Sequence, residues 1–304
     1  MKIQINKILC ASDLSDFSNI TIAVGVALAR EFNAELYVCH VIDLAATAVY
    51  HDGFYTPIDL QDQATAYAEE TLQKIVGSSS VAWQTLVPAG HPADTLTRMV
   101  QEQGIDLVII ATHGRSGLKR LIIGSVTERL MRTLPCPLLI VRSHDPKITA
   151  PIDLENKFKR ILVGCDFSHA SDQALQYGLS LAQELQSDLH LVHVMAPSVY
   201  ENLLKSNAEP APRRSEELRE QLEGRLEARL PEDAYHWCNP KTQILAGQPY
   251  EEITKYAVLH KMDLIVLGVR GLGLVEKLFV GSTTDRVARQ APCPLLSVGA
   301  QSER

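Results

Sequence analysis

The sequence lacks the features of a membrane-spanning or exported protein. Its longest apolar run, from Ile22 to Ala29, is far shorter than the roughly 20 residues that a membrane-spanning helix needs. The N-terminal stretch has neither the apolar core nor the small-residue cleavage site of a secretory signal. The 6 cysteines contain no C-x-x-C pair, which is typical of reduced thiols and not of disulfides or zinc sites. We therefore expect a cytoplasmic protein.

An excess of positive charge is also absent. The chain has 29 basic and 36 acidic residues, and its net charge is -7. This balance argues against nucleic acid or an anionic membrane surface as the partner. Hydrophobic residues make up 46% of the chain and charged residues 21%, so a globular protein with a sizeable core is expected. A length of 304 residues suggests two domains, at about 150 residues per domain.

An internal repeat supports this division. The segment from Lys7 to Asp13 aligns with the segment from Arg160 to Asp166, and the last strand-like run of each half follows a Pro-Cys-Pro. The second copy carries additional residues between positions 195 and 246. We interpret the chain as a first domain (residues 1–145), a linker (146–157) and a second domain (158–304).

Short apolar runs alternate with helical patterns in each copy, which predicts an α/β fold with a doubly wound parallel sheet of five strands per domain. In such sheets ligands bind in a crevice at the carboxyl ends of the strands. The five Arg and five Glu between Arg213 and Arg229 predict a helix with a solvated charged face, and a cover over the crevice is the alternative. In the first copy we expect strands near 7–12, 35–42, 82–87, 106–111 and 138–142, and helices near 16–32, 59–76, 92–103 and 124–133. The buried stripe of the charged helix is predicted to be Leu218, Leu222, Leu226 and Leu230.

A glycine-rich stretch follows the fourth strand of each copy. The second copy has Gly268, Gly271, Gly281 and Ser282, and the first copy has Ala111 in place of the first glycine. Glycines let backbone N–H groups approach a ligand, and a helix N-terminus attracts anions, so the stretch predicts a di- or triphosphate site. The flanking cations would complement the phosphates; they are Arg115, Lys119, Arg120, Arg270 and Lys277.

Both signals have a purely structural alternative. Ser125 and Ser282 are followed three residues later by Glu128 and Asp285, a spacing typical of a helix capping box. The aspartates at the end of the first strand of each copy, Asp13 and Asp166, could accept a ribose hydroxyl or help to hold a divalent ion. They could equally cap the helix that follows.

Taken together, these motifs resemble the universal stress protein family in its tandem form, with two UspA-type domains in one chain. The family signature G-x2-G-x9-G-[ST] is matched in full in the second copy, and the first copy departs from it at Ala111. The strand-end aspartate, the G-x-P before the third helix and the P-C-P also resemble the family, and the likeness covers nearly the whole chain. The resemblance implies an adenine-nucleotide-hydrolase-like fold with strand order 3-2-1-4-5. In the family's ATP-binding branch it implies ATP and a divalent ion such as Mg2+ in the crevice.

The resemblance also implies roles for single residues. Asp13 and Asp166 would meet the ribose or adenine side, and the backbones of Val41 and Val194 would meet the adenine. Ala111 predicts weaker binding in the first domain than in the second. Pairing of the two domains through residues 138–142 and 295–299, and a homodimer, are implied as assemblies. The phosphates would be held by Gly114, Gly124, Ser125 and Thr127 in the first domain, and by Gly268, Gly271, Gly281, Ser282 and Thr284 in the second.

Motifs of the common nucleotide-dependent enzymes are missing. The chain has no Walker G-x4-G-K-[ST], and Gly271-Leu272-Gly273 lacks the third glycine of a dinucleotide fingerprint. His113 in the first copy is replaced by Arg270 in the second, which favours electrostatics over base catalysis. The leading interpretation is an ATP-binding stress-response protein with a signalling or assembly role and at most slow hydrolysis. A nucleotide-free scaffold is one alternative, and a true ATPase, which would need a positioned base, is another.

Overall fold

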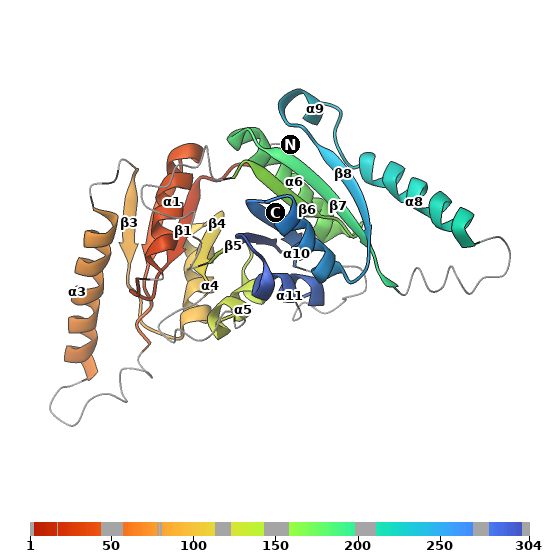
Figure 1. The fold of residues 1–304 in the computed structure, drawn as a ribbon. Coiled ribbons are helices and arrows are strands. Elements are labelled where there is room, and N and C mark those ends of the chain that lie inside the picture. Colours follow the sequence, from red (N-terminus) through yellow and green to blue (C-terminus); the bar gives the residue numbers. More distant parts are fainter. Residues whose placement is uncertain are drawn as a thin grey trace. The chain divides into compact units, whose positions relative to one another are not determined.

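The apolar runs that recur in both repeats form buried parallel strands in the computed structural model. The structure describes residues 3–16, 18–43, 57–77, 79, 81–112, 123–142, 158–197, 211–269 and 280–299 (Figure 1). Two compact units result, one built mainly from Gln4–Leu154 and one from Glu155–Ala300. We refer to them as the first and second domains.

In the first domain, parallel pairing gives the strand order β3-β2-β1-β4-β5. Cys10 in the central strand lies opposite Val38 on one side and Ile109 on the other. The central strands are buried nearly throughout, as expected where helices cover both faces of a parallel sheet. The strands are β1 (Lys7–Ala11), β2 (Glu35–Cys39), β3 (Trp83–Leu86), β4 (Leu107–Ala111) and β5 (Leu138–Val141).

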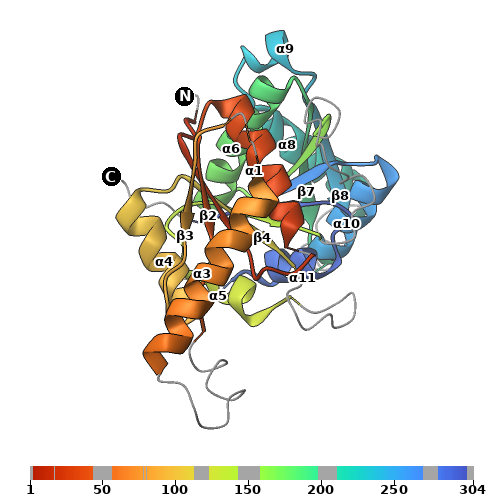
Figure 2. The ribbon, with the colours of Figure 1, turned by 90° about the vertical axis from the view of Figure 1, so that its left-hand side faces the viewer.

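The helices of the first domain form two neighbouring pairs, α1 with α3 and α4 with α5 (Figure 2). Right-handed crossovers explain the pairs, because the chain moves outward from β1 in one direction and then returns to add β4 and β5 in the other. The change of direction opens a crevice at the carboxyl ends of β1 and β4. The helices are α1 (Asn19–Phe32), α3 (Pro57–Val76), α4 (Pro92–Gln103) and α5 (Ser125–Thr133).

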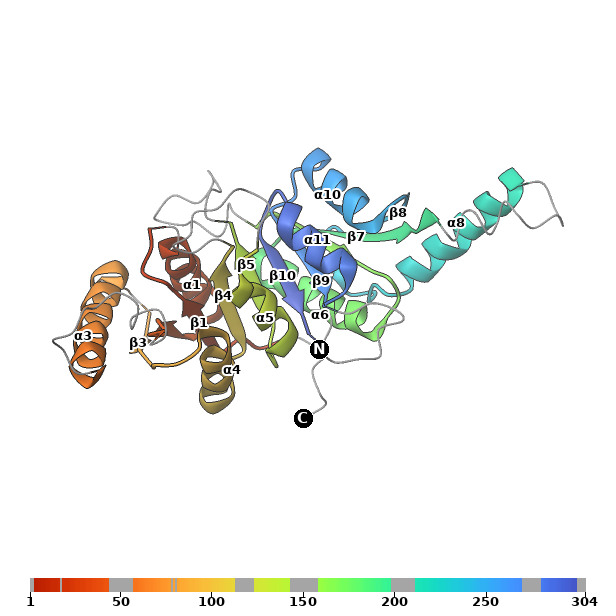
Figure 3. The same ribbon diagram turned by 90° about the horizontal axis from the view of Figure 1, so that it is seen from below.

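The second domain repeats this arrangement, with strand order β8-β7-β6-β9-β10. Helix α10 lies beside α11, and α6 packs on β6 and β9 (Figure 3). The strands are β6 (Arg160–Gly164), β7 (Asp188–Met195), β8 (Lys241–Ala246), β9 (Leu264–Gly268) and β10 (Leu295–Val298). The helices are α6 (His169–Leu185), α8 (Ala211–Glu227), α9 (Ala234–Trp237), α10 (Pro249–Leu259) and α11 (Ser282–Gln290).

Local signals in the sequence explain several helix starts. Ser168 caps α6 by accepting a hydrogen bond from the Ser171 N–H at 3.2 Å. Pro92 and Pro249 lie in the first turns of α4 and α10, where the missing N–H costs nothing. The glycine two residues before each proline has a φ of 144° or 147°, a left-handed backbone that favours glycine.

The charged helix α8 has the predicted solvated face, because most of its described charged side chains are exposed, but its leucine stripe differs from the prediction. Only the C-terminal part of the leucine stripe is buried, with Leu226 and Leu230 inside and Leu218 and Leu222 partly exposed. The N-terminal end of α8 lies away from β8 (Figure 1). The stripe therefore anchors α8 at one end.

Two further findings concern the chain's environment. Among the helices that the structure describes, none combines the length and apolarity that a bilayer crossing requires. All 6 cysteines lie in the described residues, where none forms a disulfide, and all except Cys238 are buried. Burial raises the pKa of Cys39 to about 12, so the side chain stays a protonated thiol and acts as a small core residue.

Candidate functional site

The two strand-end aspartates brace the turn that follows their strand. Asp13 Oδ1 accepts hydrogen bonds from the Ser15 N–H at 3.1 Å and from the Ser15 hydroxyl at 2.6 Å. Asp166 Oδ1 accepts one from the Ser168 N–H at 3.0 Å. Neither aspartate is the N-cap of the next helix, because α6 is capped by Ser168 and the N-cap position of α1 is Ser18. The capping alternative is therefore wrong for both aspartates.

A histidine beside each aspartate repeats one contact in both domains. His40 Nδ1 lies 2.9 Å from the carbonyl oxygen of Ser12, and His193 Nδ1 lies 2.8 Å from that of Cys165. A carbonyl can only accept, so each Nδ1 carries the proton. Burial lowers the pKa of His193, which keeps its ring neutral at pH 7. The repeat of His-Val in the sequence was the available signal for these residues, but a role for the histidine was not predicted.

The helices after the glycine-rich stretches begin without side-chain caps. Gly124 and Gly281 occupy the N-cap positions of α5 and α11, and Ser125 and Ser282 are the first helical residues. Neither serine can form the capping box expected from the sequence, since each lies one position too late. The acidic partners pair within their own helices instead, Glu128 with Arg132 and Asp285 with Arg289. The first-turn N–H groups of both helices are thus not satisfied by a cap.

These features meet in a cavity of about 250 Å3 in the first domain. Its lining joins the carboxyl ends of β1, β2 and β4 to the first turns of α4 and α5. Among the predicted site residues it is lined by Asp13, Val41, Gly124, Ser125 and Thr127. Five residues that the sequence placed in one crevice are thus brought together.

The remaining wall of this cavity is mixed in character. Leu96 and Ile110 provide an apolar surface, and His40 and Thr112 add polar groups. Ala111 also lines the cavity, and its side chain is buried. An apolar cavity with a few converging polar groups is typical of a site for a small organic ligand.

Gly268, the counterpart of Ala111, has a packing role. A Cβ added there would lie 2.8 Å from the backbone carbonyl carbon and oxygen of Ala170 in α6. Glycine is therefore required because the first turn of α6 approaches the end of β9 too closely for a methyl group. The sequence interpretation, in which this glycine lets a ligand approach, missed the helix as the reason.

The other predicted residues of the second domain are distributed around the same strand ends. Val194 is buried in β7. The Thr284 hydroxyl donates a hydrogen bond to the carbonyl oxygen of Gly268 at 2.7 Å, which ties the start of α11 to the end of β9. Gly114 and Gly271 lie outside the described residues. The flanking cations and His113 lie there too.

The described residues also bear on metal binding. No group of three or more His, Cys, Asp or Glu side chains arranged to hold a metal ion occurs among them. The carboxylates near the crevices, Asp13 and Asp166, are each paired with a local backbone N–H. A divalent ion at either site would therefore need most of its oxygen ligands from a bound molecule or from water.

Comparisons with known proteins agree with the repeat and the fold. The model of the universal stress protein family matches residues 4–142 and 157–299. Universal stress protein Slr1230 of Synechocystis is 24% identical over 318 residues, which cover 95% of this chain and 98% of that protein. A universal stress protein of Thermus aquaticus is 37% identical over 149 residues, covering 46% of this chain and 98% of its own.

A solved structure shows the same fold over the whole length. The universal stress protein from Archaeoglobus fulgidus superposes with a TM-score of 0.72 at 22% identity, covering 99% of this chain and 100% of that one. The family match spans nearly all of both repeats. The chain therefore belongs to the universal stress protein family and carries two such domains in tandem.

Proposed function

We propose that the chain binds ATP in the strand-end crevice of its first domain, and in the matching crevice of its second domain, as part of a cellular stress response. The observation that carries the proposal is the cavity in which Asp13, Val41 and the uncapped start of α5 meet. Membership of the universal stress protein family supports the stress-response role and a nucleotide as the class of ligand.

The chemistry of the cavity suits the three parts of a nucleotide. The apolar wall of Val41, Leu96 and Ile110 fits a planar base, and the Asp13 carboxylate can accept a hydrogen bond from a ribose hydroxyl. The first-turn N–H groups of α5 and the positive end of its dipole fit the phosphates. As the alternative to a ribose contact, Asp13 would share a Mg2+ with the triphosphate, since Mg2+ commonly takes one or two carboxylates together with phosphate oxygens.

The proposed role is binding that sets signalling or assembly, with any hydrolysis slow. Among the cavity residues that the structure describes, the imidazole of His40 is the group most like a general base. Its Nδ1 donates to the Ser12 carbonyl oxygen, so only Nε2 could accept a proton. We further propose that the protein works in the cytoplasm, which its free thiols favour.

The first test is mass spectrometry of the denatured, purified protein for nucleotide that co-purifies with it. The second is a pair of charge variants, Ser125→Asp and Ser282→Asp, at the first helical positions. A carboxylate there stabilises the helix by about 0.3–1 kcal/mol through the dipole but repels a phosphate. We expect ATP affinity to fall at least about tenfold, since repulsion at close range exceeds 1.4 kcal/mol, with no loss of thermal stability.

The neutral variants Ser125→Asn and Ser282→Asn are the matched controls, because they keep the size of aspartate without its charge. They should lose far less affinity than the charged pair. If both charged variants bind ATP as the parent protein does, phosphates do not lie at these helix starts and the proposal is wrong.

A further inference from the structure

Two arginines at the C-terminal end of the α8 segment contact an aromatic ring. Arg225 is exposed and Arg229 is partly exposed, so the contact lies at the edge of the solvated charged face. The Arg225 guanidinium carbon lies 4.1 Å from the centroid of the Phe167 ring, and that of Arg229 lies 5.6 Å from it. Both distances are in the range of cation–π attraction. Arg219, two turns earlier, pairs with Glu223 on the exposed surface. The C-terminal end of α8 therefore contacts the turn between β6 and α6, next to Asp166.

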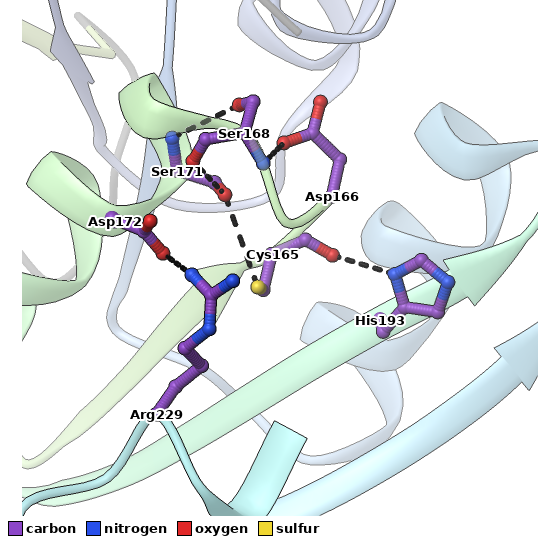
Figure 4. A network of polar contacts seen from close by, with 7 residues as sticks. All are labelled: Cys165, Asp166, Ser168, Ser171, Asp172, His193 and Arg229. Carbon is purple, nitrogen blue, oxygen red and sulfur yellow. Dashed lines mark hydrogen bonds and ion pairs between the residues drawn. The ribbon is translucent and has the colours of Figure 1, made fainter. Parts of the chain in front are cut away.

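Phe167 is held from a second side as well. The His193 ring centroid lies 4.6 Å from that of Phe167. His193 is in turn bound through Nδ1 to the Cys165 carbonyl oxygen (Figure 4). The turn that carries Asp166 is thus enclosed by β7 through His193 and by α8 through Arg225.

The conformation of this turn needs such support. Phe167 has a φ of 63°, a left-handed backbone that a bulky side chain rarely adopts. Strained residues of this kind persist where their surroundings hold them in place. Phe167 directly follows Asp166, so a change in its backbone would move the carboxylate.

A second contact fixes the helix that follows the turn. Arg229 forms an ion pair with Asp172 in the first turn of α6 (Figure 4). The Arg229 and Asp172 side chains are 28% and 36% exposed, so solvent reaches the ion pair and its contribution is modest. Ser168, which donates its N–H to Asp166 Oδ1, caps the same helix.

We propose that Arg225 and Arg229 are positioning residues, which hold the β6–α6 turn so that Asp166 is set to accept a ribose hydroxyl. This inference rests on the proposed function. It adds two residues that would influence nucleotide binding in the second domain alone. The corresponding residue of the first domain is Leu14, which has the same φ of 63° but no ring for a cation to contact. The two domains should therefore respond differently to changes in α8.

The test is hydrogen–deuterium exchange of the full chain, read by mass spectrometry on peptides from each domain, with and without ATP. The variants are Arg225→Ala, Arg225→Lys and Arg229→Ala, with Arg219→Ala as the matched control on the exposed face. Arg225→Ala should speed exchange of residues 165–168 about two- to fivefold, the scale of a lost cation–π contact at an exposed site. Arg225→Lys keeps a cation and should restore most of the protection, while the peptide around Asp13 stays unchanged.

Titrations with ATP, 2′-deoxy-ATP and 3′-deoxy-ATP test whether the turn serves the ligand. The second domain should bind ATP about tenfold more tightly than the analogue that lacks the hydroxyl bound by Asp166. That analogue loses one hydrogen bond to a charged carboxylate. Arg225→Ala and Asp166→Ala should both lower the ratio of the two affinities toward one. A merely structural role would weaken all three nucleotides equally.

The outcomes separate the two proposals. Unchanged exchange of residues 165–168 in Arg225→Ala, or an unchanged preference for ATP, overturns the positioning role even where ATP binds. If Arg225→Ala speeds exchange of the turn but no nucleotide protects the turn in the parent protein, α8 does stabilise the turn. The second domain then does not bind ATP, and its proposed function is wrong. Equal effects from Arg219→Ala would also overturn the inference, because that arginine does not reach the turn.

Discussion

The first and second domains share the strand-end aspartate and the uncapped helix start, but they differ where β4 and β9 end. The first domain has Ala111 there and the second has Gly268. Helix α6 begins at His169, whereas the equivalent helix α1 begins at Asn19, the counterpart of Asp172. The longer start of α6 brings Ala170 against β9 and leaves no space for a Cβ at position 268.

This difference changes the meaning of the motif. The departure at Ala111 looks like a defect in a ligand loop when only the sequence is considered. In the structure, Ala111 fits beside the cavity of the first domain. Gly268 is needed in the second domain because α6 contacts the end of β9. We therefore no longer expect Ala111 by itself to weaken the first site.

The largest expected effect follows from exchanging these two residues. Gly268→Ala should destabilise the second domain by about 2–3 kcal/mol, because α6 must shift to admit the methyl group. Ala111→Gly should cost the first domain about 0.5–1 kcal/mol, mostly through backbone entropy. Urea denaturation followed by domain-resolved hydrogen exchange measures both. Equal losses in the two domains would show that the contact with Ala170 is not the reason for the glycine.

The domains also differ at one matching strand position, where β7 of the second domain has the buried His190 and β2 of the first domain has Tyr37. His190 Nδ1 lies 2.9 Å from the Tyr256 hydroxyl, and the ring also neighbours His260. Burial lowers the pKa of His190 from 6.5 to about 4, with Lys241 and His260 adding to the effect. The folded protein thus resists protonation of this ring more than the unfolded chain does.

Acid should therefore destabilise the second domain. Well above pH 6.5 His190 is neutral in both states, and as the pH falls from 6.5 toward 4 the unfolded chain takes up the proton before the folded protein does. We expect a loss of about 3 kcal/mol between pH 7 and pH 4, at about 1.36 kcal/mol for each unit of the difference in pKa. His190→Phe should lose stability at all pH values but remove this part of the pH dependence, as measured by urea denaturation between pH 4 and 7. An unchanged pH slope in the variant would assign the acid sensitivity to other groups.

The sequence was sufficient for the strands and for the repeat, because continuous apolar runs bounded by turn residues leave few alternatives. It was less informative where a contact between distant segments decides the structure. Ser125 and Ser282 fit a capping pattern, yet the helices begin one residue earlier than that pattern requires. Arg225 is exposed as its charged helix predicts, but its contact with Phe167 was not predicted because the two residues lie far apart in the sequence. Spacing alone cannot reveal such pairs.

The smallest expected effect concerns the threonine that follows each helix start. The Thr284 hydroxyl donates a hydrogen bond to the carbonyl oxygen of Gly268, whereas Thr127 lines the cavity of the first domain. Thr284→Val should therefore cost the second domain about 1 kcal/mol of stability through the lost hydrogen bond. Thr127→Val should change stability by less than about 0.5 kcal/mol and act on ATP affinity instead. Thermal unfolding and titration of both variants would assign one threonine to the fold and the other to the ligand, and the opposite pattern would reverse that assignment.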